Sequence, residues 1–83
     1  MIRVKVYLHD SLKEKVKEDK VAMKNNHLYL ELEASTIIRD LLDYLELDER
    51  SIGLVVVNKK QTTLDKKLQN GDIVGLFSPL AGG

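Results

Sequence analysis

The carboxyl end of the chain carries the residues whose presence folding explains least. Gly82 and Gly83 follow closely on the last apolar, strand-like run. Glycine loses more backbone entropy on ordering than any other residue and adds no packing, so a fold gains nothing from this ending. Without Cβ atoms, the pair forms bare backbone that fits a channel too narrow for side chains. The carboxylate of Gly83 would be open to activation, for example by adenylation, and then to attack by a nucleophile.

The segment before the two glycines is suited to carrying that carboxylate outward. Pro79 fixes its own φ and favours an extended residue before it. Residues 78–83 can reach about 20 Å at ~3.3–3.6 Å per residue. We therefore expect a folded domain over residues 1–77 and a flexible tail over residues 78–83. The alternative is a frayed end without any role.

Other reactive side chains do not form a recognisable site. His9 and His27 lack companions at metal-ligand spacing, and Asp40 with Asp43 is typical of a solvated helix face. The chain has no cysteine, which excludes thiolate metal sites and thiol catalysis. Its five glycines do not form a phosphate-binding loop. We therefore expect no metal, no stably bound cofactor and no catalysis by the chain alone.

Composition narrows the possible partners. Thirteen basic and thirteen acidic residues give a net charge of zero, which provides no electrostatic footprint for nucleic acid or an anionic membrane. No apolar run approaches the ~20 residues of a membrane span, and the N-terminus alternates instead of resembling a signal peptide. We expect a cytoplasmic protein. Four lysines form the only basic cluster, either a solvated turn or a docking patch for an acidic partner: Lys59, Lys60, Lys66 and Lys67.

Hydrophobic periodicity predicts the elements that must hold the tail. An alternating pattern predicts a strand, and apolar residues three and four apart predict a helix. The predicted elements are a strand over 2–8, a short helix over 11–19, a turn at 25–26, a strand over 28–32, the main helix over 36–46 capped by Ser35 or Thr36, an inner strand over 54–57, a short edge strand over 61–63, a crossover anchored by Leu64 and Leu68, a turn at 70–72 and a last strand over 73–77.

This order predicts an α+β fold with a mixed sheet of about five strands, covered on one face by one main helix. A β-grasp arrangement results if the last strand lies beside the first in parallel. The pattern alone does not fix that pairing.

The stretch "NGDIVGLFSPLAGG" resembles the ending of the ubiquitin-like sulfur carriers, most closely the small subunit of molybdopterin synthase (MoaD type, MoaD/ThiS family). The shared pattern is a Gly71-Asp72 turn, an apolar strand ending in Phe77, a spacer containing Pro79, and a terminal Gly82-Gly83. The upstream "LVVVNKKQTTLDKKL" is similar to the family's strand, turn and crossover. The resemblance is close from about residue 28 onward and loose before it.

The resemblance implies a function. An ATP-using activating enzyme of the MoeB or ThiF type would adenylate Gly83, and sulfur would then replace AMP to give a thiocarboxylate. The tail would enter the large subunit of molybdopterin synthase (MoaE type) and donate sulfur to the pterin precursor of the molybdenum cofactor. Phe77 resembles the family's hydrophobic anchor at the partner surface, and the alternative for it is ordinary core packing. The resemblance implies that partners contact Phe77 and four tail residues: Pro79, Leu80, Ala81 and Gly82.

Three other functions stay open. The first is a thiazole-synthesis carrier of the ThiS type, although such carriers are usually shorter. The second is a ubiquitin-like modifier that forms an isopeptide bond through Gly83, which begins from the same adenylate. The third is an adaptor without tail chemistry. The departures from the MoaD pattern lie in the lysine-rich residues 11–20 and at Ser78, and they concern the sulfur acceptor more than the carrier chemistry.

Overall fold

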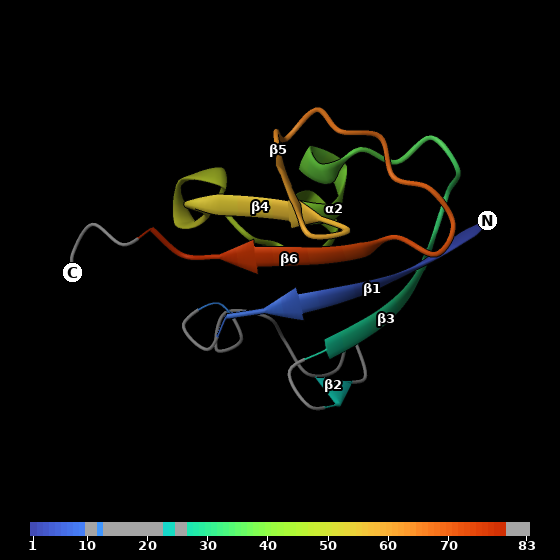
Figure 1. Ribbon diagram of the computed structural model, residues 1–83, viewed down its shortest axis with the longest axis horizontal. Helices are drawn as coiled ribbons and strands as arrows, with labels where there is room; N and C mark the ends of the chain where they lie inside the picture. The colour runs from blue at the N-terminus through green and yellow to red at the C-terminus, as the bar shows by residue number, and fades with distance from the viewer. Residues whose placement is uncertain (10–11, 13–22, 25–26, 80–83) are drawn as a thin grey trace.

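The protein is built on one six-stranded mixed sheet (Figure 1). The computed structural model describes residues 1–9, 12, 23–24 and 27–79. The strands are β1 (Ile2–Leu8), β2 (Met23–Lys24), β3 (His27–Leu32), β4 (Leu54–Val57), β5 (Lys60–Thr62) and β6 (Ile73–Phe77), and their order across the sheet is β2-β3-β1-β6-β4-β5. Helix α2 (Ile38–Tyr44) and the 3₁₀ turn η2 (Glu49–Ser51) connect β3 to β4.

The first and last strands form the centre of the sheet. β1 pairs with β6 in parallel, in the register Lys5↔Ile73 to Leu8↔Leu76, and all other strand pairs are antiparallel. In Figure 1, β1 and β6 point to the same end of the molecule, opposite the N-terminus. This pairing confirms the β-grasp arrangement. β2 adds a two-residue edge strand that the sequence did not predict.

One face of the sheet carries the core, because side chains alternate between the two faces of each strand. The residues of β1, β3, β4 and β6 on that face are buried, and α2 covers them with Ile38, Leu41 and Leu42. Leu45 and Leu47, which follow α2, complete this layer, and Leu12 also belongs to the core. Within the described residues, no helix is long and apolar enough to span a bilayer.

The main helix begins later than predicted, and the predicted cap is wrong. The residue before its first turn is Ile37, so neither Ser35 nor Thr36 caps it. The crossover segment after β5 supplies acceptors instead: the Ile38 N–H donates to the Lys66 carbonyl (3.0 Å) and the Arg39 N–H to the Leu64 carbonyl (2.9 Å). Backbone acceptors from a distant segment thus join one local side chain, Asp40, which accepts from the Ile37 N–H (3.3 Å), and sequence spacing does not reveal the distant acceptors.

The strands predicted at 2–8, 54–57 and 73–77 have the predicted bounds, and the strand predicted at 28–32 begins one residue earlier. Leu68 is fully buried and Leu64 partly so, as the predicted anchors of the crossover. The turn at 70–72 is confirmed, with Gly71 at φ +88°. The predicted turn at 25–26 lies outside the described residues, as does the helix at 11–19 apart from Leu12.

The β4–β5 hairpin contains a strained lysine. Its two loop residues, Asn58 and Lys59, both have positive φ (53° and 73°), as in the tight hairpin turn that favours Asn-Gly. We expect Lys59→Gly to stabilise the fold by about 0.5–1 kcal/mol, because glycine adopts this φ without a steric penalty. Thermal unfolding should show Tm rising by a few degrees. The neighbouring change Lys60→Gly, within β5, should lower Tm, and equal effects would contradict this reading.

Candidate functional site

The face of the sheet opposite α2 has no covering layer among the described residues. It carries the outward-facing residues of four strands, which we call the open face: Arg3, Lys5, Tyr7, His27, Tyr29, Glu31, Leu54, Val56, Ile73, Gly75 and Phe77. Several of them are large apolar groups in contact with solvent, with Tyr29 61%, Ile73 51% and Leu54 36% exposed. Exposed apolar surface of this kind is typical of a contact surface.

An aromatic cluster occupies the end of the open face where β6 finishes. The Tyr7 ring lies 5.4 Å from the His27 ring and 5.7 Å from the Phe77 ring, and the His9 ring lies 6.5 Å from Phe77. Each pair is tilted, a favourable geometry for aromatic rings. The cluster brings three strand ends together, so residues far apart in the sequence form one surface.

Phe77 is half-buried and lies outside the hydrophobic core. It faces away from α2, alongside Ile73 and Gly75 of the same strand. A Cβ on Gly75 would stand 3.0 Å from the Phe77 ring, so the missing side chain at residue 75 lets this ring lie close to the sheet. Of the two roles considered for Phe77, the geometry favours a surface position over core packing.

The tail leaves the sheet directly from this cluster. Ser78 Oγ lies 3.5 Å from His9 Nδ1, at hydrogen-bonding distance, and Pro79 is exposed. On the other side, the Gly53 N–H donates to the Phe77 carbonyl (2.7 Å). The one local signal for Gly53 in the sequence is its place before the apolar run at 54–57. Leu80, Ala81, Gly82 and Gly83 lie outside the described residues.

A buried carboxylate fixes the start of β6. Asp72 is 6% exposed, and it accepts hydrogen bonds from the Asn58 side-chain amide (3.0 Å) and the Gln69 N–H (2.8 Å). The Asn58 side-chain oxygen accepts from the Ile73 N–H (2.9 Å). Asp72 therefore ties the β4–β5 turn to the strand that carries the tail. This explains physically why a Gly-Asp turn precedes that strand.

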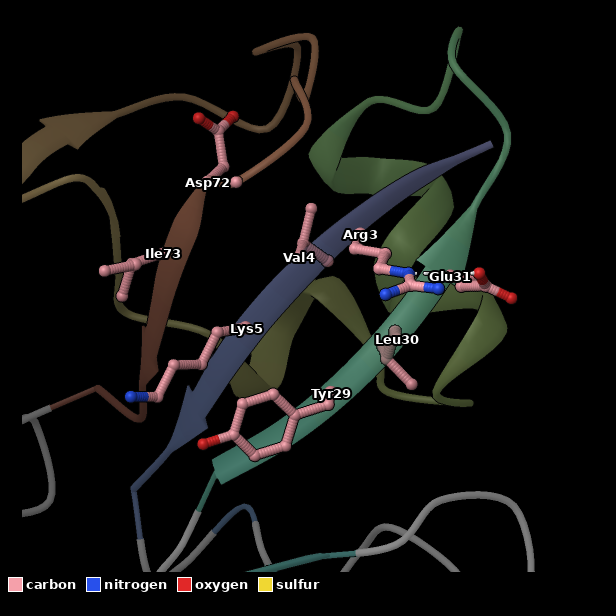
Figure 2. A pocket seen from close by; sticks show the side chains of 9 residues that line it. Arg3, Val4, Lys5, Tyr29, Leu30, Glu31, Asp72 and Ile73 are labelled. Carbon is pink, nitrogen blue, oxygen red and sulfur yellow. Dashed lines mark hydrogen bonds and ion pairs between the residues drawn. The ribbon is translucent and has the colours of Figure 1, made fainter.

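A shallow hollow of about 660 Å³ lies on the open face further from the tail (Figure 2). Lys5, Tyr29 and Ile73 line it from three adjacent strands, with the Lys5 ammonium 5.8 Å from the centre of the Tyr29 ring. Arg3 and Glu31 form an ion pair at its edge (3.3 Å). Arg3 and Glu31 neutralise each other, and the Lys5 ammonium lies over the Tyr29 ring. The hollow therefore resembles a contact surface more than a catalytic pocket.

Arg39 joins α2 to two neighbouring segments. Its guanidinium contacts the Asp65 carboxylate, and it pairs with Glu49 at 3.2 Å. The hydrogen bond that Arg39 donates to Asp65, followed by the charge of Asp65, raises the pKa of Arg39 above its ordinary value. The Arg39 guanidinium therefore stays charged and connects α2 to Glu49 and Asp65. These ion pairs stabilise the fold only slightly because they are solvent-exposed.

The four lysines of the basic cluster belong to two separate segments. Lys59 and Lys60 lie at the β4–β5 hairpin and Lys66 and Lys67 on the crossover, and all are exposed. Among the described residues, no group of histidine and carboxylate side chains could hold a metal ion.

A sequence profile of the ThiS family matches residues 10–83, nearly the whole chain. The chain belongs to the ThiS family. No curated protein sequence is significantly similar to this ThiS-family chain. The match includes the segment from Phe77 to Gly83, where the candidate site lies.

Solved structures share the fold of this ThiS-family chain at low sequence identity. A Pyrococcus furiosus protein described as a molybdopterin converting factor, subunit 1, is 20% identical, with TM-score 0.68, and the match covers 96% of this chain and 100% of that one. SAMP1 from Haloferax volcanii is 21% identical, with TM-score 0.69 and coverage of 98% and 99%. The Haloferax volcanii protein HVO 2177 is 20% identical, with TM-score 0.74 and coverage of 99% and 87%.

These similarities establish the ubiquitin-like β-grasp fold. The sequence-profile match over residues 10–83 is what places the chain among the ThiS-type proteins. Proteins of this kind work with activating enzymes and partner subunits.

Proposed function

We propose that this protein is a sulfur carrier whose Gly83 carboxylate is adenylated and converted to a thiocarboxylate, which donates sulfur to the pterin precursor of the molybdenum cofactor. The observation that carries the proposal is the ThiS-family match, which extends through Gly83. Ser78 and Pro79 begin the tail, and we call them its root. The root lies at the surface beside the aromatic cluster at the end of β6, which supports the proposal.

The chemistry is divided between the chain and its partners. The activating enzyme, of the MoeB or ThiF type, would bind ATP, and the Gly83 carboxylate would attack the α-phosphorus with release of pyrophosphate. A sulfur nucleophile would then attack the carbonyl carbon and displace AMP. The two glycines leave that carbonyl without a neighbouring side chain. The carrier would supply only a docking surface and a tail long enough to bring Gly83 to the partner's active site. The reaction would take place in the cytoplasm.

The acceptor in molybdopterin synthesis would be bound by a large subunit of the MoaE type. The thiazole pathway is the alternative that the family name itself favours. Incubating the thiocarboxylated carrier with a MoaE-type subunit and the pterin precursor tests the choice. We expect dithiolene product and loss of the thiocarboxylate, and transfer only to a thiazole synthase would contradict the molybdopterin assignment.

Protein modification is a second candidate, because two of the similar structures are of SAMP1, a small archaeal modifier protein. Both functions begin with the same adenylate, so the product distinguishes them. Intact-mass spectrometry of the carrier from cells with the activating enzyme should show a chain heavier by the difference between one sulfur and one oxygen atom. Conjugates to lysine without any thiocarboxylate would instead support the modifier.

Phe77→Ala should weaken docking to the activating enzyme. Truncation of an aromatic anchor at an interface typically costs 2 kcal/mol or more, so we expect KM for the carrier to rise about 10–100-fold. The exposed Tyr44 ends helix α2 on the opposite side of the sheet from Phe77, which makes Tyr44→Ala a matched control. ATP–pyrophosphate exchange at varied carrier concentration measures both. Equal KM values for the two variants would remove Phe77 from the interface.

A further inference from the structure

The root of the tail lies in a slot formed by Gly53. Gly53 stands between η2 and β4, and its N–H holds the Phe77 carbonyl at 2.7 Å. A Cβ added to Gly53 would lie 2.5 Å from Pro79 Cα, 2.7 Å from Pro79 N and 3.1 Å from the Ser78 carbonyl carbon. All three are backbone atoms, so no side-chain rotation could relieve the contact. The tail therefore crosses residue 53 at a distance that only glycine permits.

Space, and not backbone conformation, requires the glycine here. Gly71 is the one described glycine with positive φ, so Gly53 has a φ that alanine adopts without strain. Ordinary contacts of a Cβ begin at 3.4 Å, and an alanine at residue 53 would have to push Pro79 away by about 1 Å. Gly53 is itself exposed, and none of its close neighbours belongs to the core. The displacement would therefore fall on the tail.

We propose that Gly53 is a positioning residue that sets the direction in which the tail leaves the sheet. The ring of Pro79 limits rotation at the root, so a change of direction there is carried outward along the chain. Four residues follow Pro79 and can reach at most about 13 Å at ~3.3 Å per residue, so the activating enzyme can receive Gly83 only within this distance of the point where the tail leaves the sheet. A misplacement of about 1 Å at a reacting group can cost ~10²-fold in rate.

This inference rests on the proposed function, because its consequence is the placement of the Gly83 carboxylate. In the activation step, a carboxylate oxygen attacks the α-phosphorus of ATP. A carboxyl–phosphate bond forms, the bond between the α- and β-phosphates breaks, and pyrophosphate leaves. Phe77 is held by the pairing of β6 with β4 and by its contact with the Tyr7 ring, so we expect its position to change less than that of Pro79. A substitution at residue 53 should therefore change kcat for adenylation more than KM for the carrier.

The kinetic test is ATP–pyrophosphate exchange with a MoeB- or ThiF-type activating enzyme from the same organism. For Gly53→Ala we expect kcat to fall at least tenfold, with KM for the carrier changed less than threefold. Gly71→Ala is the matched control, because a Cβ there meets nothing within 4 Å and the change strains only the backbone at φ +88°. That variant should lose stability and keep its kcat. Unchanged kcat in Gly53→Ala would overturn the inference.

A second variant and a structural measurement keep the inference testable if Gly53→Ala folds poorly. Pro79→Gly leaves the slot intact but frees the root to rotate, and kcat should fall several-fold with Tm unchanged. In NMR spectra of the wild type, an NOE should join the Gly53 and Pro79 α-protons, and its absence would overturn the slot. Absence of exchange in the wild type, with that NOE present, would instead contradict the proposed function.

Discussion

Deletion of Gly83 is expected to lower the rate of carrier adenylation by at least ~10²-fold without changing Tm. The shortened chain ends about 3.5 Å too early, which is far beyond the misplacement that an activated reaction tolerates. Tm should not change because the buried apolar residues of the described chain end at Leu76, before the tail begins. ATP–pyrophosphate exchange and thermal unfolding measure the two effects.

Two further variants define what the terminal residue supplies. Adding one glycine after Gly83 keeps every native residue and moves the carboxylate outward, so it should lower exchange as strongly as the deletion. Gly83→Ala keeps the length and adds one methyl group, so it should have a smaller effect set by the width of the channel. A deletion variant with full exchange would show that the reactive group is elsewhere, and a large fall in its Tm would show that the tail is part of the folded domain.

Leu68→Ala should be among the most destabilising single changes in the described chain. Leu68 is 1% exposed within the core, and its N–H donates to the Thr36 carbonyl (2.9 Å). We expect a loss of about 2–5 kcal/mol from the buried volume alone, out of roughly 5–15 kcal/mol for a domain. The same segment provides the carbonyl groups that accept from the first turn of α2, so loosening it should also fray the helix.

Leu64→Ala provides the comparison. Leu64 is in the same segment and is the same residue type, but it is only partly buried at the edge of the core. Urea unfolding should show a fall in midpoint for Leu68→Ala at least twice that for Leu64→Ala. Hydrogen exchange of the Ile38 and Arg39 amides should be faster in the Leu68 variant. Equal midpoints would mean that the crossover is not anchored through Leu68.

Most of the sheet could be predicted from the chain because alternation is a local property. The strands over Ile2–Leu8 and Ile73–Phe77 follow directly from apolar residues two apart. The tight turns at Asn58-Lys59 and Gly71-Asp72 are also encoded locally. The cap of α2 was mispredicted because its acceptors come from residues 64 and 66, more than 20 positions along the chain. Local spacing carries no information about such partners.

The tail residues would carry the proposed chemistry in any fold, because two glycines, a stiffening proline and a terminal carboxylate keep their properties wherever they lie. The point at which the tail leaves the sheet depends on how the chain folds. The tertiary structure placed Phe77 on the open face with Tyr7 and His9, and it set Gly53 against the backbone of Pro79. Such placements depend on strand pairing between residues distant in the chain. Pairing is fixed by burial of the whole core, which no short stretch of sequence specifies.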